Sequence, residues 1–416
     1  MTADRPRPVV FVLSSVQAMA PSGVTTFVRQ LIASSKGAGA LFGIVELPTT
    51  EVVDPGEPVL GSTMDGPADT AATTDDGERE APVVMVEPGG ILRETQGERI
   101  LPLVLGYVKE CLRDIRRVWA VRDKCRGKTL VTNLFGCELF PVALRMVNPW
   151  SRIIAIAHTH PGQDARARHY VRRLVERLCY HCVSEVIYNS DSTRREWGYK
   201  LGLRQPKGQV VYLGTEPPDD TIPVDYPARQ AGVVDFLCVA RFANWKGQGN
   251  LIRAWKAMLN QGVRNARLIL IGEGECLNAV QQEAQQLGVR ETVVFLGYRD
   301  KADCYFNEAD VAVLMSTEPE AFGLVLLEGM SRGKPVIASR LGGITEIVQD
   351  GETGLLVDPT DIEAISNALC SLATSEGERR RLGNNGKRVW ASKFTLGHMI
   401  QRYHAAFGIA ACNQVG

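Results

Sequence analysis

The sequence has no long hydrophobic run, no excess of charge of either sign and no pattern of paired cysteines. A membrane-crossing helix needs about 18 consecutive apolar residues, and no segment of the 416 residues approaches that length. The 47 basic and 47 acidic side chains cancel, which argues against nucleic acid as a partner. The 10 cysteines show no disulfide framework, and a chain of this length needs none. We therefore expect a cytoplasmic protein, with peripheral contact at the inner face of the membrane as one option.

Two further patterns are incomplete. The sequence lacks the G-x-G-x-x-G fingerprint after its first predicted strand, 9–13, which disfavours a dinucleotide-dependent oxidoreductase. Cys179 and Cys182, with His181 between them, resemble half of a zinc site. Because no second half follows, we interpret them as ordinary half-buried thiols.

Short β-branched runs alternate with helical patterns along the chain, which predicts parallel sheets joined by helices in an α/β fold. We expect one Rossmann-like domain over 1–216, a proline-rich linker over 217–232, a second Rossmann-like domain over 233–395, and a C-terminal helix and tail over 396–416. The strands are predicted at 9–13, 41–46, 83–87, 129–133, 153–157, 186–189, 210–214, 235–240, 266–271, 292–295, 310–314 and 335–338. Helices in the second domain are predicted at 248–259, 277–287, 322–332 and 362–374, followed by one at 396–407.

Charge is distributed unevenly along the chain. Residues 41–100 hold 13 acidic and 3 basic side chains, whereas residues 101–208 hold 20 basic and 9 acidic ones. Within the acidic part, 48–82 is too polar to bury a core, so we expect a mobile insertion, either a lid or, preferably, a plain solvated loop. The basic clusters comprise Arg113, Arg116, Arg117, Arg122, Lys124, Arg126 and Lys128, and then Arg166, Arg168, Arg172, Arg173 and Arg177. They could bind an acidic acceptor or an anionic membrane, or simply neutralise the insertion.

Two glutamates, Glu320 and Glu328, flank the start of the helix predicted at 322–332. The first turn of a helix exposes backbone N–H groups that favour an anion, and Gly323 leaves room for a phosphate to approach the backbone. Glu328 could accept hydrogen bonds from a ribose diol. As isolated residues, however, two glutamates would more simply be solvated.

Two cations, Arg241 and Lys246, lie five residues apart on the turn between a predicted strand and helix. Side chains placed in this way can both reach a diphosphate and stabilise its developing charge. An isolated pair of loop cations is usually solvated. The surrounding sequence therefore decides between a diphosphate-binding role and plain solvation.

These segments resemble the E-x7-E and Arg-x4-Lys-Gly motifs of family 4 retaining glycosyltransferases, over most of the chain apart from 48–82. The resemblance implies the GT-B fold, with two Rossmann-like domains facing a cleft and the C-terminal helix crossing back to the first domain. It implies catalytic roles for Glu320, His158, Arg241 and Lys246. The residues that it places at the donor are Gly23, Arg241, Lys246, Gly272, Gly297, Glu320, Phe322, Gly323, Leu324, Val325 and Glu328. Many members have two adjacent glycines at this position, whereas this chain has only Gly23.

Polar residues follow two predicted strands of the first half. His158 and His160 come directly after the strand at 153–157, where an open sheet binds ligands, and the resemblance places His158 near the donor sugar. His160 could orient the acceptor or be a plain loop histidine. Asn189 or Asp191 could line the acceptor side or cap the following helix.

The resemblance implies transfer of a sugar from a nucleoside diphosphate to an acceptor hydroxyl with retained configuration. The leaving diphosphate would take the acceptor proton, and Glu320 would hold sugar hydroxyls. UDP-sugars such as UDP-N-acetylglucosamine or UDP-glucose are favoured as donors, with GDP-mannose as an option, and the acceptor is a small molecule, a glycan or a lipid-linked glycan. No D-x-D motif is present, so we expect no cofactor and no metal. The alternatives are a non-catalytic nucleotide-sugar-binding protein and an epimerase of the same fold.

Overall fold

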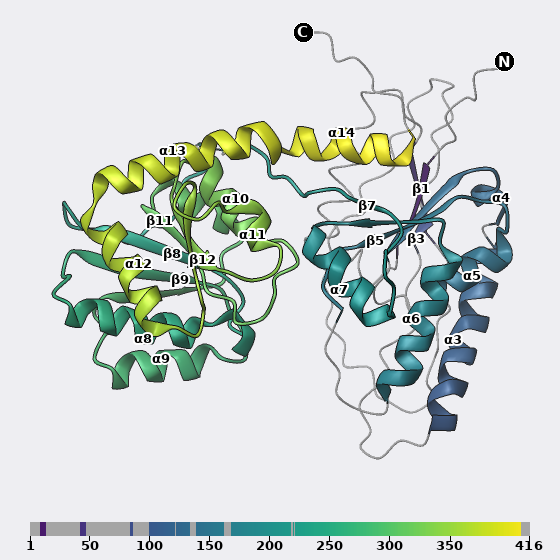
Figure 1. Cartoon of the computed structure of the whole chain (residues 1–416), viewed down its shortest axis with the longest axis horizontal. Helices are drawn as coiled ribbons and strands as arrows, with labels where there is room; N and C mark the ends of the chain where they lie inside the picture. Colours follow the sequence, from purple (N-terminus) through teal and green to yellow (C-terminus); the bar gives the residue numbers. More distant parts are fainter. Residues whose placement is uncertain are drawn as a thin grey trace, which may run out of the picture. The chain divides into compact units, whose positions relative to one another are not determined.

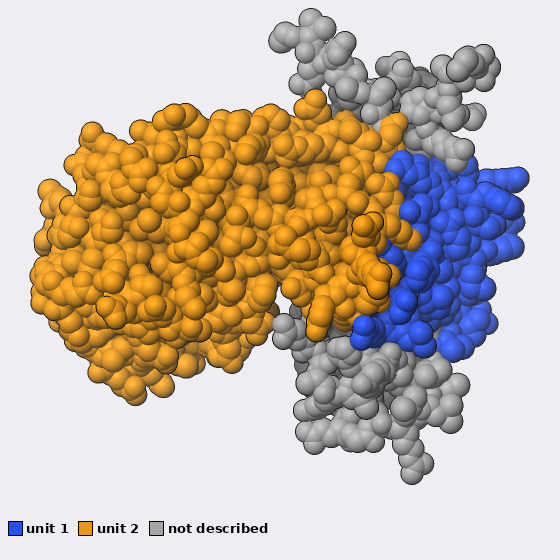
Figure 2. Space-filling view, viewed as in Figure 1, with its two compact units in different colours: residues 1–155, 170–184, 412–416 blue, residues 156–169, 185–411 orange. Residues whose placement is uncertain are grey.

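The computed structural model describes residues 9–13, 42–46, 84–85, 100–120, 122–133, 139–161, 168–217, 219 and 221–408. The chain divides into two compact units (Figure 2). The first takes in 1–155, 170–184 and 412–416, and the second takes in 156–169 and 185–411. The limits of the predicted domains and linker stay a prediction.

The first sheet has its strands in the order β2-β3-β1-β4-β5-β6-β7. They are β1 (Val9–Leu13), β2 (Phe42–Glu46), β3 (Val84–Met85), β4 (Thr129–Asn133), β5 (Ile153–Ala157), β6 (Glu185–Tyr188) and β7 (Gln209–Val210). The helices among them are α3 (Ile100–Ala120), α4 (Arg122–Cys125), α5 (Phe140–Val147), α6 (Arg168–Cys182) and α7 (Asp191–Leu201). Every residue of β5 is buried, as its uninterrupted apolar sequence requires of a parallel strand covered on both faces.

The second sheet is parallel throughout, in the order β10-β9-β8-β11-β12-β13. Its strands are β8 (Val234–Val239), β9 (Ala266–Ile271), β10 (Val293–Gly297), β11 (Val311–Leu314), β12 (Val336–Ser339) and β13 (Gly354–Val357). Its helices are η1 (Asn244–Lys246), α8 (Gln248–Asn260), α9 (Leu277–Gln286), η2 (Ala302–Asn307), α10 (Leu324–Ser331), α11 (Ile344–Ile347), α12 (Ile362–Thr374), α13 (Glu376–Lys393) and α14 (Leu396–Phe407).

Helices cover both faces of this second sheet (Figure 1), and a hydrophobic core lies on each face. Side chains alternate along β8, so that Phe236 and Cys238 pack with α8, α9 and α12, whereas Leu237 packs with α10 and α11. The sheet is therefore doubly wound, and the loops at the carboxyl ends of its strands are free to form a site.

The junction between α13 and α14 pairs with the chain that follows β7. Thr215 donates its N–H to Phe394 O (3.0 Å) and accepts from Leu396 N (2.8 Å), and the indole N–H of Trp390 donates to Thr215 Oγ1 (2.9 Å). These bonds correct the strand predicted at 210–214. It ends at Val210, because the chain beyond it turns to pair with this junction.

Helix α13 was not predicted, because Gly383, Asn384, Asn385 and Gly386 in its middle form helices weakly. The fold requires the first of these glycines. A Cβ on Gly383 would lie 1.9 Å from Gly333 O, so the helix and the turn before β12 meet backbone to backbone. Close packing of this kind outweighs the low helix propensity of the segment.

No helix in the described part of the chain is both long and apolar enough to cross a membrane. The cysteines that the structure describes are all free thiols, including the buried Cys179 and the half-buried Cys182 of the incomplete zinc pattern.

Candidate functional site

Four loops meet at the carboxyl edge of the second sheet, and each carries residues singled out from the sequence. Arg241 follows β8, Gly272 follows β9, Gly297 ends β10 and Glu320 follows β11. Backbone hydrogen bonds join neighbouring loops, with Gly272 N donating to Gly297 O (2.9 Å) and Thr317 N donating to Trp245 O (2.7 Å). The parallel topology therefore gathers into one place residues that are far apart in the sequence.

A nearly buried ion pair lies at the centre of these loops. Lys246 Nζ is 2.5 Å from Glu320 Oε1, and the two side chains are only 15% and 12% exposed. The Ser316 hydroxyl donates to the same carboxylate oxygen. The Lys246 ammonium also lies 4.1 Å from the centre of the Trp245 ring. Glu320 is thus held in one orientation by a cation and a hydroxyl.

Gly247 makes this pair possible. It has a φ of +68°, and a Cβ there would lie 1.9 Å from Met315 O. Only glycine allows the turn that contains η1 to close onto the chain that leaves β11. The glycine of the Arg-x4-Lys-Gly motif thereby brings Lys246 to Glu320.

Arg241 is placed differently from Lys246. Its side chain is 71% exposed and pairs with Glu275 (3.0 Å) rather than with Glu320. Only its backbone is fixed, because Arg241 O accepts a hydrogen bond from the side-chain amide of Gln248 (2.8 Å). The two predicted diphosphate cations therefore comprise one nearly buried ammonium paired with Glu320 and one exposed guanidinium paired with Glu275.

The start of α10 is open in the way that an anion site needs. Gly323 occupies the N-cap position, and no side chain caps the helix. Leu324 and Val325 form its half-buried first turn. Phe322 is buried, and its ring stacks on Tyr212 with the ring centres 5.8 Å apart, while its predicted contact with the donor stays a prediction.

Glu328 lies in the second turn of α10 and is partly buried. Within the described residues its carboxylate has no hydrogen-bond partner. Burial raises the pKa of Glu328 to about 7, the charge of Asp303 adds to this rise, and the charge of Arg332 opposes it. A partly buried carboxylate without a hydrogen-bond partner among the described residues is poised to accept hydrogen bonds from a ligand.

The histidines after β5 lie among residues that contact the Glu320 loop. His160 Nε2 lies 3.0 Å from Glu320 O, a hydrogen bond in which the ring N–H donates. His158 O accepts from the side-chain amide of Asn189 (2.8 Å). Burial lowers the pKa of His158 to about 4, so its imidazole is neutral at physiological pH.

Neither proposed cap of α7 is its cap. Ser190 holds that position and accepts from Thr193 N (3.0 Å). Asn189 instead bonds to His158, and Asp191 pairs with Arg194 (2.5 Å). The serine is favoured because its short hydroxyl reaches the third amide of the helix while its backbone stays extended.

Several residues that build the site were missed in the sequence. Gly343 N donates to Glu320 O (2.8 Å), which supports the Glu320 loop from the turn after β12. Glu346 accepts from Asp191 N (2.8 Å) and Ser192 N (2.7 Å), and so places its carboxylate at the start of α7. The adjacent glycines Gly342 and Gly343 before a short helix were the available signal.

Gly23 and the insertion at 48–82 lie outside the described residues, and their predicted roles stay predictions.

Comparison with known proteins gives a consistent picture. The family model for glycosyl transferases group 1 matches residues 228–389, which contain both motifs. The chain is 30% identical over 260 residues to an uncharacterized glycosyltransferase from Methanocaldococcus jannaschii, covering 60% of this chain and 65% of that protein. It is 35% identical over 252 residues to a GDP-mannose-dependent alpha-(1-6)-phosphatidylinositol monomannoside mannosyltransferase from Mycolicibacterium smegmatis, covering 57% of this chain and 65% of that one.

A solved structure agrees with the fold along the chain. Anabaena HepE in complex with UDP matches with a TM-score of 0.67 at 18% identity, covering 96% of this chain and 99% of that one. At that identity the likeness concerns the fold alone. With the family model and the two motifs, it supports the family predicted from the sequence and confirms the predicted fold: residues 228–389 match the group 1 glycosyltransferases, and the chain has the GT-B fold. The chain spans less than two thirds of the length of the curated relatives that it matches.

Proposed function

We propose that the protein transfers a sugar from a nucleoside-diphosphate sugar to an acceptor hydroxyl with the anomeric configuration retained. The observation that carries this proposal is the fixed Lys246–Glu320 pair in the loops that meet beside the open start of α10. A cation, a carboxylate and free helix amides suit, respectively, a diphosphate, sugar hydroxyls and phosphate oxygens.

In the proposed reaction the bond between the anomeric carbon and the diphosphate oxygen breaks. The acceptor oxygen forms its bond on the same face, and its proton passes to the departing diphosphate. Lys246 and Arg241 stabilise the charge that gathers on that diphosphate, and Glu320 holds the sugar in position. His158, neutral because of its lowered pKa, acts as a hydrogen-bonding group rather than as an acid.

The nucleoside would be bound by Glu328 and by the loops at Gly272 and Gly297. The Glu328 carboxylate accepts the two ribose hydroxyls, which supply the hydrogen bonds that it otherwise lacks. We propose a UDP-sugar as donor, supported by the UDP complex of HepE. GDP-mannose, the donor of the Mycolicibacterium smegmatis relative, is the second candidate.

We propose that the reaction needs no metal, since the sequence has no D-x-D motif to bridge a cation to the diphosphate. Turnover should be unchanged after treatment with EDTA. A loss of activity that added Mg²⁺ restores would contradict this.

The proposed acceptor is a glycan, a small molecule or a lipid-linked glycan that the protein meets at the inner face of a membrane. Leu112 on α3 and Leu174 and Leu178 on α6 are exposed large apolar residues on arginine-bearing helices. Exposed leucines beside arginines suit an anionic bilayer surface. Sedimentation with phosphatidylglycerol vesicles, compared with neutral phosphatidylcholine vesicles, tests this contact. Equal recovery with both would leave the arginines as a counter-charge to the acidic insertion.

The test of the proposed function is a panel of nucleotide sugars assayed for donor hydrolysis and for transfer. Glu320→Gln and Glu320→Ala should each lower turnover about a hundredfold or more, as is typical when a positioned active-site group is lost. Glu283→Gln is the matched control, because Glu283 pairs with Arg253 at the surface (2.6 Å) and should leave turnover unchanged. Donor binding without any hydrolysis or transfer would favour a nucleotide-sugar-binding protein instead, and near-normal rates in either Glu320 variant would refute its role.

A further inference from the structure

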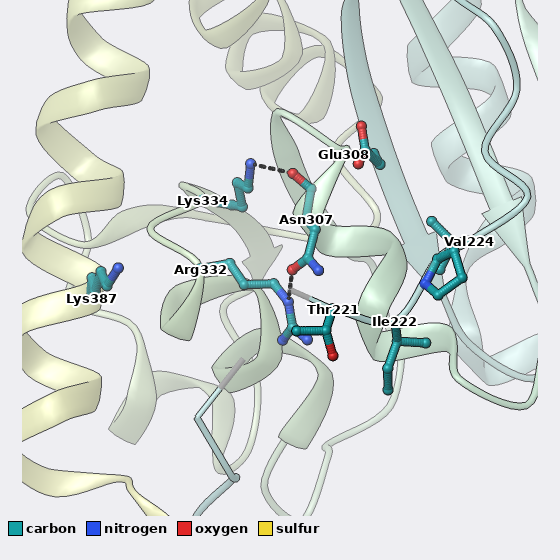
Figure 3. Close-up of a pocket in the computed structure, with 9 residues that line it drawn as sticks. Thr221, Ile222, Val224, Asn307, Glu308, Arg332, Lys334 and Lys387 are labelled. Carbon is teal, nitrogen blue, oxygen red and sulfur yellow. Dashed lines mark hydrogen bonds between the residues drawn. The ribbon is translucent and has the colours of Figure 1, made fainter. Parts of the chain in front are cut away.

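A hollow of about 650 Å³ lies at the amino edge of the second sheet (Figure 3). Its walls come from the segment before β8, from the residues before β11, from the turn before β12 and from α13. Residues that precede parallel strands lie at the opposite edge from residues that follow them. The hollow is therefore separate from the Lys246–Glu320 site, and no role assigned above uses it.

The lining of the hollow is basic. It contains three cations, Arg332, Lys334 and Lys387, and one carboxylate, Glu308. Figure 3 shows Lys387 extending from α13 toward the turn that carries the other two cations. Lys334 donates to the backbone oxygen of Asn307 (3.1 Å), and burial lowers its pKa. In the part of the chain that the structure describes, neither lysine forms an ion pair, so an anion would give both a partner.

The turn that carries these cations is held in place. Arg332 is only 5% exposed and donates to the side chains of Asn307 (2.5 Å) and Asp303 (3.1 Å) and to Glu328 O (3.2 Å). The close approach of Gly383 to Gly333 fixes α13 against the same turn. Arg332 therefore acts on the hollow through its positive charge. The ammonium groups of Lys334 and Lys387 still have N–H donors that can bind a ligand.

We propose that this hollow binds a phosphate monoester of a polyhydroxylated small molecule, such as a sugar phosphate. Lys334 and Lys387 contact the phosphate, and the Glu308 carboxylate accepts hydrogen bonds from the hydroxyls. The volume exceeds what a phosphate group alone would fill and lies in the range of small-ligand sites, about 300–1,000 Å³.

Arg332 connects this hollow to Glu328. Its guanidinium donates to Glu328 O (3.2 Å), and its positive charge lowers the pKa of Glu328 and so favours the ionised form. A bound phosphate would offset that charge, protonate more of Glu328 and weaken donor binding, and by linkage the donor would weaken phosphate binding to the same degree. This coupling, unlike the phosphate site itself, rests on the proposed role of Glu328.

Calorimetric titration of the full chain with glucose 6-phosphate tests the site, with glucose and inorganic phosphate as separate arms. We expect glucose 6-phosphate to bind, inorganic phosphate to bind more weakly and glucose not to bind. Lys387→Gln should weaken binding about tenfold or more, the loss of one charge-assisted hydrogen bond. Lys393→Gln, which removes an exposed lysine from the same helix, should not.

Three results would overturn the site. They are equal binding of glucose and glucose 6-phosphate, equal affinity in the Lys387 variant and the parent, and loss of binding in Lys246→Gln, which would place the probe among the donor loops. Inorganic phosphate binding as tightly as glucose 6-phosphate would refute the contact with hydroxyls.

The coupling is tested by measuring the affinity for the donor with and without saturating glucose 6-phosphate. The donor should bind more weakly with the probe present in the parent protein, and the probe concentration that just saturates the parent should weaken donor binding less in Lys387→Gln. An unchanged donor affinity in the parent, with the probe bound, would refute the coupling. A donor that fails to bind even without the probe would refute the proposed function, while the phosphate site would stand on the titration alone.

Discussion

Replacing Glu328 with glutamine should make the protein more stable at neutral pH while it weakens donor binding. Burial on α10 raises the pKa of this carboxyl from 4.5 to about 7. The native state therefore holds the proton more tightly than the unfolded chain, and ionising Glu328 destabilises the fold. The penalty is absent below pH 4.5, where both states are protonated, grows as the pH rises, and is complete above about 7.

The size of the penalty follows from the shift. A change from 4.5 to about 7 corresponds to roughly 3 kcal/mol at about 1.4 kcal/mol for each pKa unit. Glutamine has the same shape as glutamate and never ionises. Glu328→Gln should therefore recover most of the lost stability at pH 8 and little of it at pH 5. For a domain of this size that is about 6–12 °C in the midpoint of thermal unfolding.

Scanning calorimetry of the two proteins between pH 5 and pH 8 measures the difference directly. Glu283→Gln breaks only a surface ion pair, so it should change the free energy of unfolding by no more than about 1 kcal/mol at either pH. If the advantage of Glu328→Gln does not grow with pH, the carboxyl is not desolvated as the structure indicates.

The affinity of the parent protein for the donor should rise with pH, whereas its stability falls. With a pKa of about 7 the ionised fraction of Glu328 rises roughly tenfold between pH 6 and pH 8, and the affinity of the parent protein for the donor should rise to a similar extent. Glu328→Gln should bind the donor more weakly, and its affinity should not rise with pH. Any pH dependence that remains in this variant comes from other titrating groups. A parent affinity that is independent of pH would refute the proposed contact with ribose.

The remaining predictions concern the framework around the site. Asp235→Asn should destabilise the protein by about 3–5 kcal/mol in thermal unfolding, because Asp235 is fully buried in an ion pair with Arg267. Asp350→Asn breaks an exposed pair and should cost less than about 1 kcal/mol. Gly247→Ala should cost at least about 1–3 kcal/mol and lower turnover, and normal activity would show that the Lys246 turn tolerates a side chain. His158→Gln should lower turnover without changing the pH profile between 5.5 and 8, because the pKa of His158 is about 4.

Several elements could be read from the sequence because their signal is local. The strands at Val9–Leu13, Thr129–Asn133, Ile153–Ala157 and Ala266–Ile271 were predicted to the residue, since a short run rich in apolar and β-branched residues marks a buried parallel strand. The start of α10 was predicted at 322, two residues before the helix begins at Leu324.

Other features depend on residues that meet only in the fold. Helix α13 contradicts its own propensity because Gly383 must touch the turn at Gly333. Nothing around residue 346 in the sequence says that its carboxylate accepts the first amides of α7. The cap of α7 went to Ser190 among three adjacent polar candidates, a choice made by backbone geometry.

The sequence by itself determined the resemblance to a family, the alternation of strands and helices, and the residue types at the carboxyl edge of the second sheet. The tertiary structure decided which of them meet and in what state. It joined Lys246 to Glu320 while leaving Arg241 exposed, it desolvated Glu328, and it brought Lys387 to the turn at Lys334. The physical reason is that a local pattern specifies hydrogen bonding and the buried face along the chain. Burial and electric field, in contrast, are sums over neighbours that are distant in sequence.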